Sequence, residues 1–193
     1  MFFLIADTHF LHNNIIKYCG RPYHYNELLE ENMRKTLTRD DVLIHLGDIC
    51  LGRDAYVHAR YINPLPCKKI LIRGNHDKQS SKWYLEHGWD VVFEKTMYLL
   101  TKYGNVILSH KPIWPIPKFY RYNIHGHLHN KKPRTWRCLL LKMANWFVGK
   151  RHILVSVEDL NYRPVALDNL IGQHWNKADQ MIFTPKGTSL PFK

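Results

Sequence analysis

Residues 2–9 read FFLIADTH, and from this stretch we infer the first strand of the fold. A short apolar run that ends in polar residues is typical of a buried strand. Asp7 and His9 follow the run directly, and side chains two positions apart in an extended segment point to the same side. The stretch therefore predicts a first, buried strand that places a carboxylate and an imidazole together at its carboxyl end.

Four later apolar runs are followed by polar side chains of the same kinds, and they lie at residues 42–46, 70–72, 106–108 and 122–124. Two further strands are expected at residues 91–93 and 153–157. In open α/β sheets, ligands collect at the carboxyl ends of the strands. We therefore expect five strand ends to bring one set of side chains to a common rim: Asp7, His9, Asp48, Asn75, His110, His127 and His129.

Helical patterns lie between the early strands. The spacing predicts a helix over Glu27–Thr38 that is capped by Asn26, and shorter helices over Asp54–Ile62 and Ser80–His87. Strand–helix alternation then gives way to strands in closer succession. This order indicates an α/β sandwich rather than a barrel.

The side chains at the rim are metal ligands by chemical type. Carboxylate, amide-oxygen and imidazole donors suit manganese, iron or zinc rather than calcium, and the four scattered cysteines form no C-x-x-C pair of a structural zinc site. Seven ligands exceed the need of one ion and fit two ions that share a carboxylate, for which Asp48 is the candidate. His76 stands outside this set, beside Asp77, whose carboxylate could orient it.

The motifs that contain these residues resemble those of a known family. In order and spacing they are similar to the motif set of the calcineurin-like metallophosphoesterases: D-x-H at 7–9, G-D at 47–48, G-N-H-D at 74–77, S-H at 109–110 and G-H-x-H at 126–129. Residues 155–165 look like the closing strands of small bacterial and phage members, whereas Leu11 stands where small relatives often carry glycine. The resemblance implies a four-layer α-β-β-α sandwich, with a single domain over residues 1–172.

The resemblance also implies the ligands of two divalent ions: Asp7, His9, Asp48 and His129 for one, and Asp48, Asn75, His110 and His127 for the other. It makes His76 the catalytic histidine, with Asp77 as its partner. Two ions about 3.5–4 Å apart lower the pKa of a shared water and yield a metal-bridging hydroxide near neutral pH. His76 would then stabilise the developing charge or protonate the leaving oxygen. Manganese is the expected metal, with iron or zinc as alternatives.

The net charge of +12 is concentrated in one part of the chain. Residues 95–157 hold twelve of the 28 Lys and Arg residues and none of the 16 Asp and Glu residues, so the remainder is balanced. A local positive field attracts phosphates, nucleic acid or an acidic lipid surface, although it also serves solubility alone.

Four residues are candidate substrate contacts. Lys118 and Arg121 are interleaved with aromatic residues in the loop at 114–122, where they could grip a phosphate while a ring stacks on a base. The alternative is a proline-stiffened loop whose aromatic residues cover core. His12 and Asn13, shortly after the first motif, are the other two candidates.

The segment at 131–151 carries apolar residues at helical spacing, with basic residues at both ends. It predicts an amphipathic insertion that closes over the site, contacts nucleic acid, lies on anionic lipid or packs on core.

Residues 173–193 are polar and are expected to form a C-terminal extension. No apolar run approaches the ~18 residues that cross a bilayer, and a cytoplasmic protein is expected.

Together these features predict a dinuclear metal-dependent phosphoesterase, most simply a phosphodiesterase that acts on a nucleotide or nucleic acid. The alternatives are a phosphomonoesterase or protein phosphatase, and a lipid-linked pyrophosphate hydrolase at a membrane surface. A nucleic-acid-binding or scaffold protein on the same fold is the non-enzymatic alternative, against which the complete ligand set argues. The sequence does not fix the oligomeric state.

Overall fold

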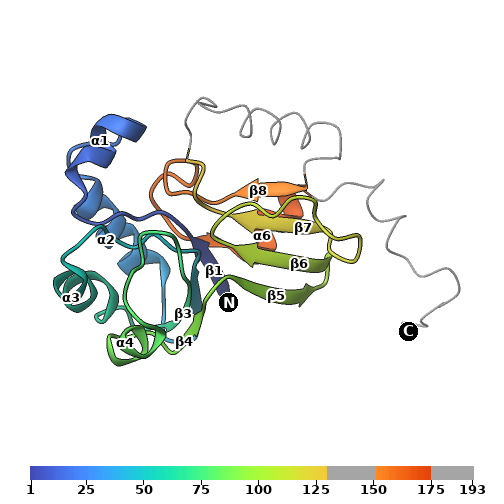
Figure 1. The fold of residues 1–193 in the computed structure, drawn as a ribbon, viewed down its shortest axis with the longest axis horizontal. Helices are drawn as coiled ribbons and strands as arrows, with labels where there is room; N and C mark the ends of the chain where they lie inside the picture. Colours follow the sequence, from blue (N-terminus) through green and yellow to red (C-terminus); the bar gives the residue numbers. More distant parts are fainter. Residues whose placement is uncertain (130–150, 175–193) are drawn as a thin grey trace, which may run out of the picture.

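The structure is a computed structural model that describes residues 1–129 and 151–174. Its first sheet has the strand order β4-β3-β2-β1-β9 (Figure 1). Strands β1 to β4 run parallel, and β9 pairs antiparallel with β1. The strands are β1 (Phe2–Ile5), β2 (Val42–His45), β3 (Lys68–Ile72), β4 (Val91–Phe93) and β9 (Val165–Ala166).

The second sheet has the order β5-β6-β7-β8. Strand β5 pairs antiparallel with β6, whereas β6, β7 and β8 run parallel. The strands are β5 (Thr96–Thr101), β6 (Gly104–Ser109), β7 (Tyr122–His125) and β8 (His152–Leu154). The two sheets pack face to face, which confirms the predicted α/β sandwich.

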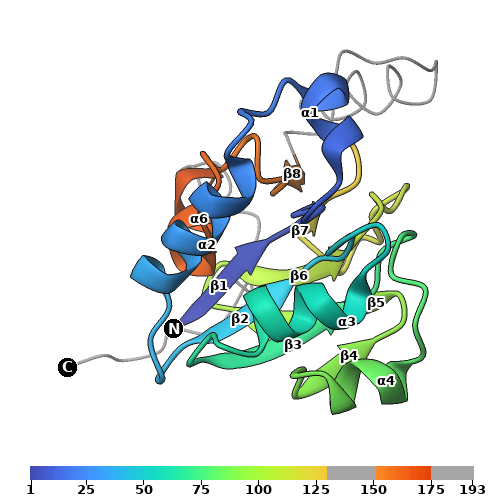
Figure 2. The same ribbon diagram turned by 90° about the vertical axis from the view of Figure 1, so that its left-hand side faces the viewer.

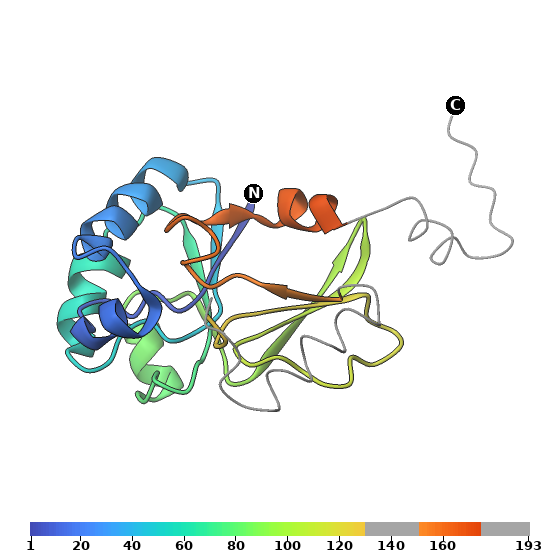
Figure 3. The same cartoon turned by 90° about the horizontal axis from the view of Figure 1, so that it is seen from above.

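Helices line the side of the first sheet that faces away from the second (Figures 2 and 3). They are α1 (Asn13–Cys19), α2 (Tyr25–Thr36), α3 (Asp54–Val57), the π-helical turn η1 (His58–Ile62) and α4 (Ser81–Glu86). Helix α6 (Leu167–His174) follows β9 and packs its apolar residues against the core between the sheets.

Alternation along the central strands divides the core in two. Ile5 and Leu43 face the helices, whereas Leu4 and Ile44 face the second sheet, and all four are fully buried. Successive side chains of a strand point to opposite faces, so a strand covered on both sides reads as a continuous apolar run. This is why the sequence marks β1 and β2 so clearly.

Other elements differ from the sequence-based prediction, which omits α1, β5 and α6. Helix α2 begins at Tyr25, and Asn26 is not its cap, because the Asn26 Oδ1 accepts a hydrogen bond from Leu11 N at 2.9 Å. Strand β5 contains the apolar run Met97–Leu100, but it is covered on one face only, and Tyr98 and Leu100 on its other face are exposed. The helix predicted over Asp54–Ile62 is divided into α3 and η1.

The predicted amphipathic insertion at 131–151 lies outside the described residues, except for its last residue. Most of the predicted extension at 173–193 lies outside them as well. The predicted domain boundary at residue 172 falls inside α6, so this helix continues past it.

We expect Leu4→Ala to lower the free energy of unfolding by about 2–5 kcal/mol, because it opens a cavity between the sheets. Leu100→Ala is the matched control: Leu100 is 84% exposed, and its truncation should change stability by less than ~0.5 kcal/mol. Urea unfolding of both variants measures the difference. Equal effects would contradict this description of the core.

Candidate metal centre

Five strands deliver polar side chains to one edge of the sandwich, as the sequence predicts. Asp7, Asp48 and Asn75 follow the parallel strands β1, β2 and β3, and His110 and His127 follow the parallel strands β6 and β7. The carboxyl ends of the two sheets meet here, where Ala6 and Ser156 form a parallel bridge.

Glycines in the motifs allow the loops to approach this closely. A Cβ on Gly126 would lie 2.6 Å from Asp7 Oδ2, and one on Gly74 would lie 2.2 Å from Asp48 Oδ1. Real Cβ atoms do not approach oxygen this closely, so any larger residue would push a carboxylate out of place. The glycines therefore belong to the site, although they supply no ligand.

Most of the ligand-bearing residues adopt left-handed backbone conformations. The φ angles are 59° at Asp7, 45° at His9, 60° at Asp48, 69° at His127 and 50° at His129. Such conformations are uncommon outside glycine, and they persist where surrounding contacts hold them. They turn each chain segment sharply after its strand, so that the side chains converge.

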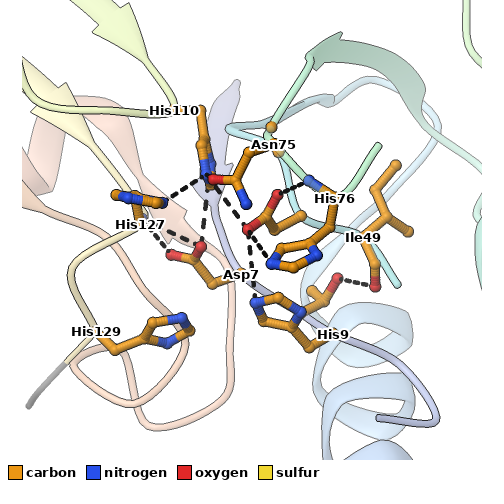
Figure 4. Close-up of polar contacts among 12 residues, drawn as sticks. Asp7, His9, Ile49, Asn75, His76, His110, His127 and His129 are labelled. Carbon is orange, nitrogen blue, oxygen red and sulfur yellow. Dashed lines mark hydrogen bonds and ion pairs between the residues drawn. The ribbon is translucent and has the colours of Figure 1, made fainter. Parts of the chain in front are cut away.

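The converging side chains form two groups of possible metal ligands (Figure 4). Within each group the ligand atoms lie within 4.8 Å of one another, and the groups are Asp7–His9–His129 and Asp48–His110–His127. A third group that meets the same distance, Cys19–His129–Glu158, shares His129 with the first. Asn75 adds its Oδ1, which lies 3.0 Å from His110 Nε2. All seven predicted ligands are thus brought together.

Asp48 lies between the two groups. Its Oδ2 is 3.3 Å from His110 Nε2 in its own group and 3.7 Å from His9 Nε2 in the other. Its Oδ1 accepts a hydrogen bond from His76 N at 2.8 Å. The carboxylate is therefore placed within reach of both groups.

The donor set fits divalent cations. His110 Nδ1 lies 2.8 Å from Leu46 O, a contact that orients the ring with Nε2 toward the site. In the described part of the chain, His9 Nδ1 is buried without a hydrogen-bond partner. A buried polar atom of this kind calls for a partner that is not protein.

The pKa values match a site built for positive charge. Burial alone would raise the pKa of Asp48, but the hydrogen bond and positive charge of His110 hold it well below the usual range. Burial also disfavours protonated His110, yet the Asp48 and Asp7 carboxylates raise its pKa. Burial lowers the pKa of His9 to about 2, so this imidazole is neutral, as a metal ligand must be.

Glu158 and Arg21 support the ligands, and sequence analysis missed both roles. The Glu158 Oε1 is 3.1 Å from His129 Nδ1, an arrangement in which a carboxylate orients a histidine and leaves Nε2 to a metal. Arg21 Nε donates to the same oxygen at 2.8 Å, and its Nη1 and Nη2 donate to Thr8 O and Asp7 O. Burial opposes both charges of the histidine–carboxylate pair, but the partners raise the pKa of His129 and lower that of Glu158.

The expected pairing of Asp77 with the His76 ring is not what the structure shows. The Asp77 carboxylate accepts backbone hydrogen bonds from Gly74 N at 2.7 Å, Asp48 N at 2.8 Å and Ile49 N at 3.0 Å. Both carboxylate oxygens are thus bonded to backbone amides of the metal-binding loops, and Asp77 fixes these loops instead. The ring of His76 faces the site by itself, with Nε2 3.9 Å from Asp48 Oδ2.

The structure does not bring Lys118 and Arg121 to the metal centre. Because β6 and β7 run parallel, the loop between them must return from the metal edge to the opposite end of the sheet. Arg121 directly precedes β7, its side chain is 5% exposed, and it packs on the Tyr122 ring. Phe119, next to Lys118, lies beside the start of β6, because its carbonyl oxygen accepts a hydrogen bond from Asn105 Nδ2.

His12 and Asn13 follow the first motif at the metal edge. The His12 ring lies 5.5 Å from the His9 ring, so it borders the site. Asn13 is exposed as the first residue of α1. Their contact with substrate stays a prediction.

A model described as calcineurin-like phosphoesterase matches residues 1–178 of the chain. The chain belongs to the calcineurin-like phosphoesterases. As a member, it is a metal-dependent phosphoric ester hydrolase that uses divalent metals. Among the described residues, no helix is both long and apolar enough to cross a membrane.

This phosphoesterase also resembles individual proteins. The uncharacterised protein MJ1445 of Methanocaldococcus jannaschii is 34% identical over 175 residues, which is 88% of either chain. The solved structure of AQ665 from Aquifex aeolicus, a protein of unknown function, is similar with a TM-score of 0.68 and 24% identity, covering 90% of this chain and 98% of that one. A structure described as a novel archaeal phosphodiesterase has a TM-score of 0.44 and 15% identity, covering 80% of this chain and 81% of that one, and is too distant to bear on function.

We expect Glu158→Gln to weaken Mn²⁺ binding at the Asp7–His9–His129 group by about 10–100-fold, because the neutral amide no longer orients and polarises His129. Isothermal titration calorimetry measures the change. Glu31→Gln is the matched control, since Glu31 is exposed and pairs only with Lys35 among the described residues. If Glu158→Gln does not fold, Glu158→Asp replaces it; unchanged affinity in a folded variant would refute the positioning role.

Proposed function

We propose that the chain is a dinuclear phosphodiesterase that acts on a nucleotide or nucleic acid. The observation that carries this proposal is the position of Asp48 between two complete ligand groups. One shared carboxylate between two such groups is the arrangement that suits two neighbouring ions. All seven ligand positions are filled, which argues against a scaffold that has lost its metals.

Two divalent ions held by the seven ligand side chains would lower the pKa of a water and polarise the phosphoryl oxygens. The protein itself supplies the means of assisting the leaving group. The candidate proton donor is His76 of the G-N-H-D motif. Its side chain is 35% exposed, and its ring lies 5.3 Å from the ring of the ligand His9. From this position Nε2 can donate a proton to the oxygen that departs from phosphorus.

The protein also fixes the loops before substrate arrives. Asp77 holds three backbone amides of the loops that carry Asp48 and Asn75, and Arg21 holds the carbonyls of Asp7 and Thr8. Ligands and proton donor are thereby oriented by buried groups that do not touch substrate. Orientation of this kind is a large part of what an enzyme contributes to the rate.

The substrate class is supported by charge. Residues 95–157 carry no acidic side chain, and Lys111 directly follows the ligand His110. A phosphodiester that belongs to a longer anionic molecule suits this field. The alternative of a lipid-linked substrate depends on residues 131–151, which lie outside the described part of the chain apart from Arg151.

We expect the protein to hydrolyse bis-p-nitrophenyl phosphate when Mn²⁺ is added and to lose this activity when a chelator is present. Asp48→Ala should bind fewer than two ions per chain and show no turnover, because it lacks the shared carboxylate. Absorbance of released nitrophenolate and metal analysis after dialysis measure the two effects. Faster hydrolysis of p-nitrophenyl phosphate would favour a monoesterase, and two tightly held ions in Asp48→Ala would refute the bridging role.

His76→Ala should keep both ions and lose about 10²–10⁴-fold in kcat for a diester with a poor leaving group, because the proton donor is missing. The loss should be smaller for bis-p-nitrophenyl phosphate, whose leaving group needs little protonation. His24→Ala is the control, since His24 is the exposed residue before α2. Loss of bound metal in His76→Ala would make His76 a ligand instead.

A further inference from the structure

A groove opens directly beside the metal centre, on the side of Asn75 and His110. Its volume is about 390 Å³, within the ordinary range for a ligand site. One wall is the segment after β3, another is the turn between β4 and β5, and the third is the segment after β6. The residues of interest in these walls are Arg73, Asn75, Glu94, Lys95, His110 and Lys111.

The walls of this groove are held in place by hydrogen bonds. Ser109 Oγ donates to Lys111 O at 2.8 Å, and Ile113 N donates to Asn123 Oδ1 at 2.7 Å. On the other side, Arg73 N donates to Phe93 O at 2.9 Å. The groove is therefore formed before a ligand enters.

The groove has an excess of positive charge. Arg73 and Glu94 neutralise each other through an ion pair of 2.6 Å. Lys95 and Lys111 are exposed and make no ion pair with any described residue. Their ammonium groups are thus available to an anion that enters the groove.

Both lysines are close to the metal ligands. Lys111 follows His110 in the chain, and its charge adds to burial and to His110 in lowering the pKa of His127 to about 4. Thr96 pairs with Ser109 at the end of the β5–β6 ladder, so the register places Lys95 next to His110. An anion held by these lysines would therefore lie beside a phosphate held at the metal centre.

We propose that Lys95 and Lys111 form a subsite for a second phosphate of the substrate, next to the phosphodiester that is cleaved. This inference rests on the proposed function and extends it, because it makes the preferred substrate one that carries at least two phosphates. Two lysines act as point charges that fit a phosphate without demanding one orientation. The same chemistry serves a phosphate one sugar away, as in a nucleic-acid strand, and one bonded directly, as in a pyrophosphate.

The test compares inhibitors of bis-p-nitrophenyl phosphate hydrolysis. Thymidine 3′,5′-bisphosphate carries a second phosphate one sugar away, and thymidine 5′-diphosphate carries a second phosphate bonded directly to the first. Thymidine 5′-monophosphate has a single phosphate and serves as the reference. The quantity measured is the ratio of the monophosphate Ki to the Ki of each two-phosphate compound. Ratios are compared within each variant, so changes in turnover alone do not affect them.

In the unmodified protein, one of these ratios should be about tenfold, and it should fall at high salt as the lysines are screened. Lys95→Gln and Lys111→Gln should each reduce it about two- to fivefold, and the double variant should bring it close to one. Lys102→Gln is the matched control, because Lys102 lies at the other end of the β5–β6 hairpin and pairs with Asp168. The compound that shows the effect identifies the spacing of the second phosphate.

The proposal is overturned if both ratios are near one in the unmodified protein, or if the double variant keeps the original ratio. It is also overturned if Lys102→Gln causes the same loss. If bis-p-nitrophenyl phosphate is not hydrolysed at all, the proposed phosphodiesterase function fails separately. Calorimetric Kd ratios for the same three compounds, with Mn²⁺ present, then decide on the subsite by the same criteria.

Discussion

The carboxylate of Asp7 joins the two sheets at their common edge. It follows β1 of the first sheet, and it accepts hydrogen bonds from His127 N at 2.9 Å and from Ser156 Oγ at 2.5 Å. These two donors belong to segments that follow strands β7 and β8 of the second sheet. The side chain has no exposure to solvent, and burial raises its pKa, although the nearby histidines and Ser156 act against the rise. A buried charge needs such partners, so the geometry of the whole edge depends on keeping Asp7 satisfied.

A second buried charge cluster connects distant parts of the chain to the same edge. Arg21 and Glu158 are 137 residues apart in sequence, and their side chains are essentially inaccessible to solvent. A buried ion pair adds little to stability compared with apolar packing, and leaving one partner alone is strongly unfavourable. The pair is therefore better understood through what it positions: His129 on one side and the Asp7–Thr8 backbone on the other.

Local sequence patterns predict the positions of side chains that directly follow a buried strand. A ligand directly after a buried strand, such as Asp48 or His110, is predictable because the strand fixes where its carboxyl end lies. Glu158 and Arg21 are not predictable in this way, since their roles exist only after the chain brings them together. Lys118 and Arg121 are close to His110 and His127 in sequence, but the direction of β7 carries their loop to the far end of the sheet.

Leu11 holds a left-handed backbone conformation at the metal edge without disturbing the fold. Its φ angle is 60°, a conformation that glycine adopts freely and leucine does not, but its side chain packs against the helical core. Apolar contact and the hydrogen bond from Leu11 N to Asn26 hold the backbone where a glycine would rest without strain.

The left-handed backbone at the ligand positions also limits how this edge can change during evolution. Asp, Asn and Gly tolerate positive φ angles far better than branched residues, whose Cβ substituents clash with the chain. Asn or Gly at position 7 or 48 would therefore fit the turn but lose the carboxylate and its hydrogen bonds, whereas Val or Ile would strain the turn as well. A descendant that abandoned catalysis would keep the backbone of these turns most easily by substituting within that small set of residues.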